Sequence, residues 1–349
     1  MLLLLLFHLV LCFSMGNRFL NRPKPAPFTD HNRILSVILS YNINHFESVG
    51  VILHEYSAMC EAGWAPTVVL LTFSNYTAKM QKLVQHKTYC SRNQRHLPVV
   101  IETNYNISSS RRYFAEHLDE HDLFVYQEDD MILRVSHIAE FVKALYRLNE
   151  ILPASEMQDK TVGFLRYRRD NVLHPPYLSA KDTQSVRDAQ EEDVVNMEFI
   201  EEEPSVGYLC LAKMEEPWLH FGGNLHQAFW ILVRDQIDYM QTKCQFLNQS
   251  KPTGVSGTIE YTSDMSIWDR GPNKHNPAGG CGMTKMMPPE VERFSVLHYY
   301  PGARRSRSRH SMYSEIRRFY VGNRAFKGII PDCWQKIVAN AKAEEARGI

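Results

Sequence analysis

The order of apolar and polar residues predicts that short strands alternate with helices from position 33 onward. Runs rich in Val, Ile and Leu are typical of buried strands, and apolar residues at intervals of three and four are typical of helices. The predicted strands are 34–41, 67–73, 98–102 and 123–126, and the predicted helices are 46–62, 109–118 and 135–152. Because the strands are apolar at nearly every position, we expect them to be buried on both faces. The series predicts an α/β fold with a doubly wound, mostly parallel sheet.

The second half of the chain has a different pattern. Strands are predicted at 162–166 and 229–233, but long polar connections separate them, and 168–193 is typical of a surface loop. Gly and Pro are dense in 248–257 and 270–289, and long loops over a rigid sheet often carry binding function. We therefore expect a mixed second half with its loops at a binding site.

The N-terminus predicts entry into the secretory pathway. The chain is mainly apolar from Met1 to Phe13, a length typical of a signal-peptide core and too short for a membrane span. No Lys or Arg precedes this run, so a signal anchor that lacks its first residues fits equally well. The expected location is the Golgi or ER lumen, as a type II membrane protein anchored by the N-terminus, or outside the cell if the signal is cleaved. The predicted divisions are a signal peptide or anchor (1–16), a Pro-rich stem (17–32), a globular domain (33–330) and a C-terminal helix or tail (331–349).

Composition narrows the classes of partner. The chain has 349 residues, and its 39 Lys and Arg equal its 39 Asp and Glu, so it has no net field to hold a polyanion and nucleic acid is not an expected partner. Six cysteines follow Cys12, an even number typical of disulfides in an oxidising lumen, and none has CxxC spacing. Their pairing stays open. Glycosylation acceptors at Asn75, Asn106 and Asn248 also agree with a lumen.

The clearest chemical signal is an acidic cluster, Glu128, Asp129 and Asp130, directly after a predicted buried strand. Burying three carboxylates is too costly unless a cation or hydrogen-bond donors compensate. Ligands of open α/β sheets bind at the carboxyl ends of strands, where these acids lie. Mg²⁺ and Mn²⁺ accept one or two protein carboxylates together with substrate phosphate oxygens. The cluster predicts a metal-bound diphosphate, with an acidic cap of the helix at 135–152 as the alternative.

A strand that ends in Glu-Asp-Asp after a βαβ series resembles the DxD-type motif of GT-A glycosyltransferases, with Glu in place of the first Asp. This acidic form is similar to that of exostosin-like and N-acetylglucosaminyltransferase enzymes. The resemblance implies a GT-A-like (Rossmann-like) fold, Mn²⁺ or Mg²⁺, and a nucleoside-diphosphate sugar as donor. It implies that Asp130 binds the metal, Asp129 meets the nucleotide ribose and Glu128 supports the pair. His298, at the end of a short apolar strand, would be a further metal ligand, although a lone His beside two Tyr is commonly a packed residue.

The same resemblance implies contacts to the donor. Tyr41, after the first strand, would stack on the nucleotide base. A Gly-Gly turn before the strand at 229–233 is similar to the segment that shapes the sugar pocket, so Asn224, His226 and Gln227 would contact sugar hydroxyls. The alternative for this stretch is an ordinary loop and strand with Trp230 in the core.

The catalytic base is expected in the segment Thr258–Trp268, which resembles the GT-A segment bearing the catalytic carboxylate. An inverting transferase needs one base for the acceptor hydroxyl, because the metal stabilises the leaving group. Asp264 is the candidate, with Glu260 second. Asp264 as a plain helix cap is the structural alternative. The basic run Arg304–His310 either closes over the diphosphate or is a solvated surface.

These observations predict a transferase that moves a sugar from a nucleoside-diphosphate sugar to a hydroxyl of a glycan, glycoprotein or lipid. The alternatives are a non-catalytic carbohydrate- or nucleotide-binding protein on a transferase fold, a metal-dependent phosphoesterase and a glycoside hydrolase. The donor sugar, the acceptor and the stereochemical course stay open.

Overall fold

The computed structural model describes the greater part of the predicted domain. The described residues are 32–41, 45–103, 108–168, 199–200, 205–209, 218–222, 228–247, 266–268, 280–288 and 291–298. The predicted signal, basic run and C-terminal helix lie outside them, as do the predicted stem apart from Asn32 and the predicted loop 168–193 apart from Arg168. Within the described residues, no helix is long and apolar enough to cross a membrane.

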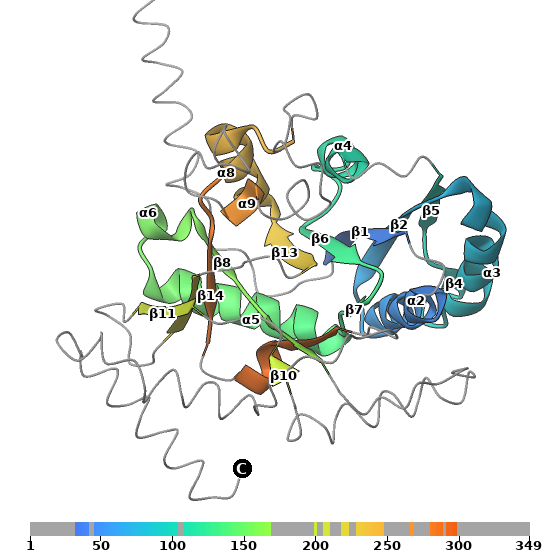
Figure 1. Cartoon of the computed structure of the whole chain (residues 1–349), viewed down its shortest axis with the longest axis horizontal. Helices are drawn as coiled ribbons and strands as arrows, with labels where there is room; N and C mark the ends of the chain where they lie inside the picture. Colours follow the sequence, from blue (N-terminus) through green and yellow to red (C-terminus); the bar gives the residue numbers. More distant parts are fainter. Residues whose placement is uncertain are drawn as a thin grey trace, which may run out of the picture.

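A five-stranded sheet forms the centre of the molecule, in the order β13-β6-β1-β2-β5 (Figure 1). Four strands are parallel, and β13 pairs antiparallel with β6. Seven of the eight residues of β1 are buried, as expected for a central strand covered on both faces. The strands are β1 (Arg33–Ser40), β2 (Ala65–Thr72), β5 (Val99–Glu102), β6 (Leu123–Glu128) and β13 (Phe229–Val233).

Helices cover both faces of this sheet. Side chains alternate along β1, so Ile34 and Ile38 pack in one apolar cluster with α2 and α5, while Leu35 and Val37 pack in another with α4 and α8. Figure 1 shows α4 and α8 on one side of the strands and α2 and α5 on the other. The predicted doubly wound, mostly parallel α/β sheet is confirmed. The helices are α2 (Phe46–Glu61), α3 (Thr77–Lys87), α4 (Ser108–Glu116), α5 (Val135–Ile151) and α8 (Arg234–Cys244).

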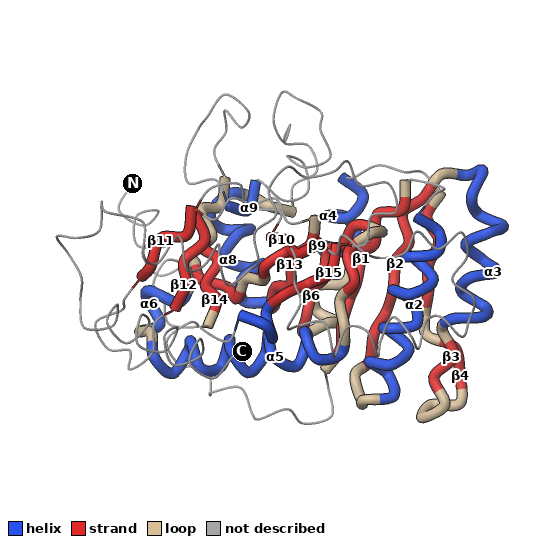
Figure 2. The backbone as a smooth tube through the Cα atoms, turned by 60° about the horizontal axis from the view of Figure 1, so that its bottom comes forward, coloured by secondary structure: helices blue, strands red, loops and turns tan. Residues whose placement is uncertain are grey.

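The second half adds two four-stranded sheets of mixed direction, in the orders β10-β9-β15-β7 and β11-β12-β14-β8. Figure 2 shows β11, β12 and β14 beyond the central strands at the end of the molecule opposite α3. The predicted mixed second half is thereby confirmed. The strands are β7 (Met131–Ile132), β8 (Lys160–Val162), β9 (Leu165–Arg168), β10 (Phe199–Ile200), β11 (Ser205–Leu209), β12 (Trp218–Gly222), β14 (Thr284–Met287) and β15 (Ser295–His298).

The strand predicted at 162–166 is two strands, β8 and β9. The break falls at Gly163, whose amide donates to the Met286 carbonyl at 2.8 Å, and at Phe164, which is buried against the rings of Phe229 and Phe294. Both residues are apolar or small, so the pattern alone contained no sign that the chain changes sheets here. The shorter described elements are β3 (Tyr89–Cys90), β4 (Arg95–His96), α6 (Ala154–Met157), α9 (Ser266–Trp268), and the 3₁₀ turns Ser74–Tyr76 and Val291–Phe294.

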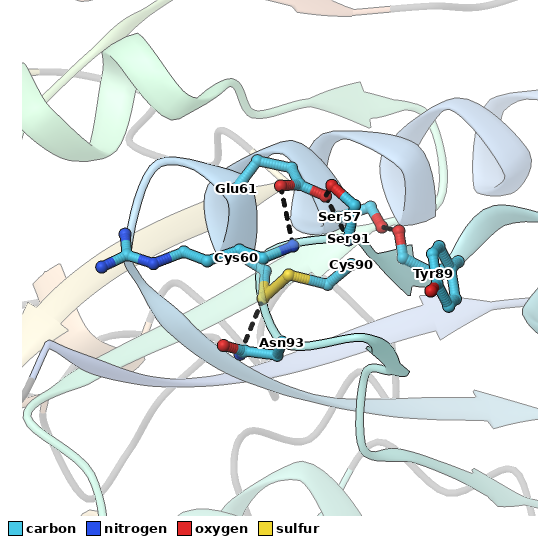
Figure 3. Close-up of a disulfide and its surroundings, with 8 residues drawn as sticks. Ser57, Cys60, Glu61, Tyr89, Cys90, Ser91 and Asn93 are labelled. Carbon is cyan, nitrogen blue, oxygen red and sulfur yellow. Dashed lines mark hydrogen bonds between the residues drawn. A yellow bond between two sulfur atoms is a disulfide. The ribbon is translucent and has the colours of Figure 1, made fainter.

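Two disulfides settle the pairing of four cysteines that the sequence left open. Cys60 at the end of α2 is bonded to Cys90 in β3 (Figure 3). Cys244 at the end of α8 is bonded to Cys281. The cysteines at 210 and 333 lie outside the described residues. Asn75 is exposed, as a glycosylation acceptor must be.

Replacing both Cys60 and Cys90 by Ala should lower the free energy of unfolding by about 2–4 kcal/mol, because the bond closes a long loop between buried residues. Urea unfolding under non-reducing conditions measures this. Asn93→Ala is the control, since it removes the hydrogen bond to Cys60 Sγ at 3.2 Å but keeps the cross-link. An unchanged urea midpoint in the double variant would contradict a stabilising role.

Candidate metal centre

The strand order changes direction between β1 and β6, two neighbouring parallel strands of the central sheet. From β1 the chain adds β2 and β5 on one side, and then crosses the other face of the sheet through α4 to place β6 on the opposite side of β1. The strand order therefore reverses between β1 and β6. This is a topological switch point, where open α/β sheets bind their ligands.

Three buried side chains meet at the carboxyl ends of these two strands: His45, which follows β1, and Asp129 and Asp130, which follow β6. One potential ligand atom from each lies within 4.8 Å of the other two. His45 Nδ1 lies 2.7 Å from Asp129 Oδ1. The three residues are only 2%, 0% and 4% exposed, respectively. In the described part of the chain, no other three His, Cys, Asp or Glu side chains form such a group.

Hydrogen bonds from α2 fix the turn that carries the two acids. Ser48 Oγ on the first turn of α2 lies 2.7 Å from the His45 carbonyl and also donates to the Asp129 carbonyl. The histidine and the acids, which belong to different βα connections, are thus held by one residue. Ser48 is itself fully buried.

A second set of hydrogen bonds supports the same turn from inside the sheet. The hydroxyls of Ser36 and Tyr56 lie 2.5 Å apart, and the Tyr56 hydroxyl donates to Gln127 Oε1 at 2.9 Å. Gln127 Nε2 then donates to the Met131 carbonyl. Residues on both sides of the Asp129–Asp130 pair are therefore fixed by polar groups in an otherwise apolar core, which preorganises the acids.

The electrostatics of the triad favour a cation. Burial raises the pKa of Asp129, because removal from water disfavours the carboxylate; the hydrogen bond and charge of His45 oppose this shift, and the charge of Asp130 adds to it. Asp129 Oδ2 is buried and accepts no hydrogen bond from any described residue. Two adjacent carboxylates suit Mn²⁺ or Mg²⁺, and an imidazole is a common ligand of transition ions. The donor set therefore fits a divalent metal.

Two other predicted residues lie beside the triad. Glu128 is the last residue of β6 and is 6% exposed, and its amide donates to the Ala228 carbonyl at 2.8 Å. Tyr41 follows β1, is half-buried, and places its ring edge-on to His45 with 6.1 Å between centroids. The predicted ribose contact of Asp129 stays a prediction, with one carboxylate oxygen facing His45. Base stacking by Tyr41 also stays a prediction.

The backbone brings His298 to the same region. Strand β15 pairs antiparallel with β7, which puts His298 opposite Met131, the residue after Asp130. Its predicted metal ligation stays a prediction. The remaining predicted site residues lie outside the described part of the chain: Asn224, His226, Gln227, Glu260 and Asp264.

His45 is the site residue that the sequence reasoning missed. It immediately precedes the apolar residues of α2 and follows Tyr41 by four positions, so it belongs to the connection after the first strand. A polar residue in the connection after β1 lies beside the acids after β6 only if β1 and β6 are neighbours in the sheet. That pairing comes from the strand order and is not visible in the pattern.

Comparison with known proteins gives no family. No protein-family model matches the chain, and no curated protein matches it. Solved structures with weak similarity include CMP:2-keto-3-deoxy-manno-octonic acid synthetase complexed with CTP, at 12% identity and a TM-score of 0.28 over 60% of this chain and 78% of that one. They also include the mannosyltransferase PcManGT from Pyrobaculum calidifontis in complex with GDP-Man and Mn²⁺, at 12% identity and a TM-score of 0.33 over 96% and 76%. With scores this low, neither similarity bears on what this chain binds.

Asp129→Asn should raise the thermal stability of the protein in EDTA. Folding raises the pKa of Asp129 above the unfolded value of 3.8. Above the folded pKa the buried carboxylate is charged and lowers the free energy of unfolding. Below 3.8 the carboxyl is protonated in both states, so this destabilisation disappears. The gain should therefore be largest near neutral pH and shrink as the pH falls toward about 4. Thermal unfolding across pH measures it.

The exposed carboxylate of Asp119 supplies the matched control, because Asp119→Asn removes the same charge from the surface. A lower melting temperature for Asp129→Asn than for the wild type in EDTA at pH 7 would show that the carboxylate stabilises the metal-free fold, contrary to this account.

Proposed function

We propose that this protein is a metal-dependent glycosyltransferase that moves a sugar from a nucleoside-diphosphate sugar to a hydroxyl of a glycan, glycoprotein or lipid. The observation that carries the proposal is the buried triad of His45, Asp129 and Asp130 at the switch point between β1 and β6. Open α/β sheets bind nucleotides at switch points of this kind, and paired carboxylates there can hold the cation that accompanies a diphosphate. The Glu-Asp-Asp motif on the same strand end agrees with the GT-A resemblance.

In this proposal Asp130, Asp129 and His45 hold Mn²⁺ or Mg²⁺, with His298 as a further ligand. When bound, the ion would neutralise charge on the diphosphate leaving group. The Ser48 contact to both connections keeps the ligands in place before the donor arrives, so that little reorganisation accompanies binding.

The donor lies along the carboxyl edge of the sheet in this proposal. Tyr41 stacks on the base at the end of β1, and Glu128 supports the acids from the end of β6. Asn224, His226 and Gln227 contact the sugar hydroxyls. These assignments rest on the resemblance and on the place of each residue after a strand.

Proton transfer is assigned to the segment before α9. Asp264, two residues before α9, accepts the proton of the acceptor hydroxyl as that oxygen attacks the anomeric carbon, and Glu260 is the second candidate. This assignment applies to an inverting course.

We assign the reaction to the lumen of the secretory pathway, in the Golgi or ER, with the N-terminus as a cleaved signal or a type II membrane anchor. Two disulfides support an oxidising compartment, because such bonds are rare in the cytosol. The exposed acceptor Asn75 agrees with it.

The test is a thermal-shift panel of the purified protein with UDP-, GDP- and CMP-sugars, each in Mn²⁺ and in EDTA, followed by a turnover assay with the donor that binds. We expect one nucleotide class to stabilise the protein in Mn²⁺ only. Asp130→Asn should lower turnover more than about 100-fold, because losing even an outer-shell partner of a metal ligand costs about 10–100-fold. Asp119→Asn is the control and should retain full activity.

The possible results separate the transferase from its rivals. Nucleotide binding without sugar transfer to any acceptor would indicate a binding protein on a transferase fold. Hydrolysis that persists in EDTA would indicate a glycoside hydrolase. Absence of any metal-dependent shift would overturn the proposal.

A further inference from the structure

A second cleft lies at the opposite end of the central strands. It occupies about 290 Å³, close to the lower end of the roughly 300–1,000 Å³ typical of small-molecule sites. Its lining includes Arg33, the first residue of β1, whereas the metal centre lies beyond Ser40, the last. At about 3.3 Å per residue, the two sites are separated by roughly 23 Å along β1.

Three parts of the chain form the walls of this cleft: the start of β1 and β2, the β3–β4 hairpin, and the turn after α4. The hairpin is held to α2 by the disulfide between Cys60 and Cys90, both of which line the cleft. Glu61 fixes the hairpin loop further, since it accepts hydrogen bonds from Ser91 Oγ at 2.8 Å and from the Arg92 amide at 3.2 Å (Figure 3). The wall that carries the cationic side chains is therefore rigid.

The acidic groups near the cleft are already engaged. Arg33 is paired with Asp122, with Nη2 3.1 Å from Oδ1 and Nε 3.3 Å from Oδ2. Glu120, a lining residue, lies 2.9 Å from Nδ1 of His117. Arg95, by contrast, is exposed and makes no side-chain hydrogen bond or ion pair within the described residues. Its guanidinium is therefore available to bind a ligand.

The three histidines of the lining have the same arrangement, with Nδ1 engaged inside the protein. His96 Nδ1 lies 3.2 Å from the Thr88 hydroxyl, and His121 Nδ1 lies 3.2 Å from the His117 carbonyl. His117 Nδ1 faces Glu120. In each ring, Nε2 is therefore the nitrogen available to a ligand. It becomes a hydrogen-bond donor when the ring is protonated.

The spacing of these rings argues against a metal ion. His117 and His121 have 6.0 Å between ring centroids, and within the described residues the donor atoms come close enough for a shared ion only at His45, Asp129 and Asp130. Donors that are spread over a larger cleft match a polyatomic anion, whose several oxygens accept hydrogen bonds in different directions. Arginine and protonated histidine are the side chains that bind such groups.

We propose that this cleft binds a small ligand that carries an oxyanion (phosphate, sulfate or carboxylate) through Arg95 and the Nε2 atoms of His96 and His121. Binding strengthens as the pH falls, because protonation makes each Nε2 a donor and gives the ring a positive charge. Burial lowers the pKa of His121, whereas a bound anion favours the charged form of this ring. The titratable and charged groups that face the ligand are Arg33, Arg95, His96, His117, Glu120 and His121, with Asp122 on Arg33.

The experiment is calorimetric titration of the full chain after EDTA has stripped it of metal and dialysis has removed the EDTA, so that neither the metal centre nor the carboxylates of the chelator contribute. The probes are inorganic phosphate, glucuronate and glucose, each at pH 5.5 and pH 7.5. We expect phosphate and glucuronate to bind at pH 5.5, with affinity several-fold lower at pH 7.5, and glucose not to bind. Tighter binding of phosphate identifies the free anion as the ligand class, and tighter binding of glucuronate identifies an acidic saccharide.

Variants locate the binding within the cleft. Arg95→Gln and His96→Gln should each lower the affinity at pH 5.5 by about tenfold, the loss expected for one charge-assisted hydrogen bond. Lys82→Gln, which removes an exposed positive charge from α3, is the matched control and should bind as the wild type does. Equal affinities of Arg95→Gln and Lys82→Gln, binding of glucose as tight as that of glucuronate, or no anion binding at pH 5.5 would each overturn the proposal. None of these results depends on the transferase activity.

Discussion

The structure depends on keeping two adjacent carboxylates in its interior. Asp129 and Asp130 are removed from water at the end of β6, and His45 is hydrogen-bonded to the first of them. Such a pair is stable only if the surrounding structure holds it rigidly or a cation compensates its charge. The polar residues of the core serve this requirement, because Ser36, Tyr56 and Gln127 fix the turn that contains the acids.

The two ends of the central sheet have opposite electrostatic character. The carboxyl end of β1 faces the buried acids, whereas its amino end faces arginines and histidines. A formal net charge of zero over the whole chain conceals this separation. Different elements close the two ends, namely the β1–α2 connection at one and the disulfide-linked hairpin at the other.

Much of the fold was predictable from periodicity. The predicted strands at 34–41 and 67–73 match β1 and β2 within two residues, because a buried parallel strand is apolar at almost every position. The helix α3 was missed, since Met80 is its only buried residue and its surface is polar. The division of 162–166 between two sheets was missed because Gly163 and Phe164 have no distinctive pattern.

The sequence by itself determined the fold class and the acidic end of β6, because hydrophobic period and three consecutive acids are local properties of the chain. Tertiary structure alone decided that His45 joins those acids, since their connections meet only when β6 pairs beside β1. It also decided which cysteines pair and which arginines and histidines share the second cleft. Each of these groupings joins residues that are far apart in the chain and that the strand order brings together. The hydrophobic period of a segment does not specify its place in the strand order.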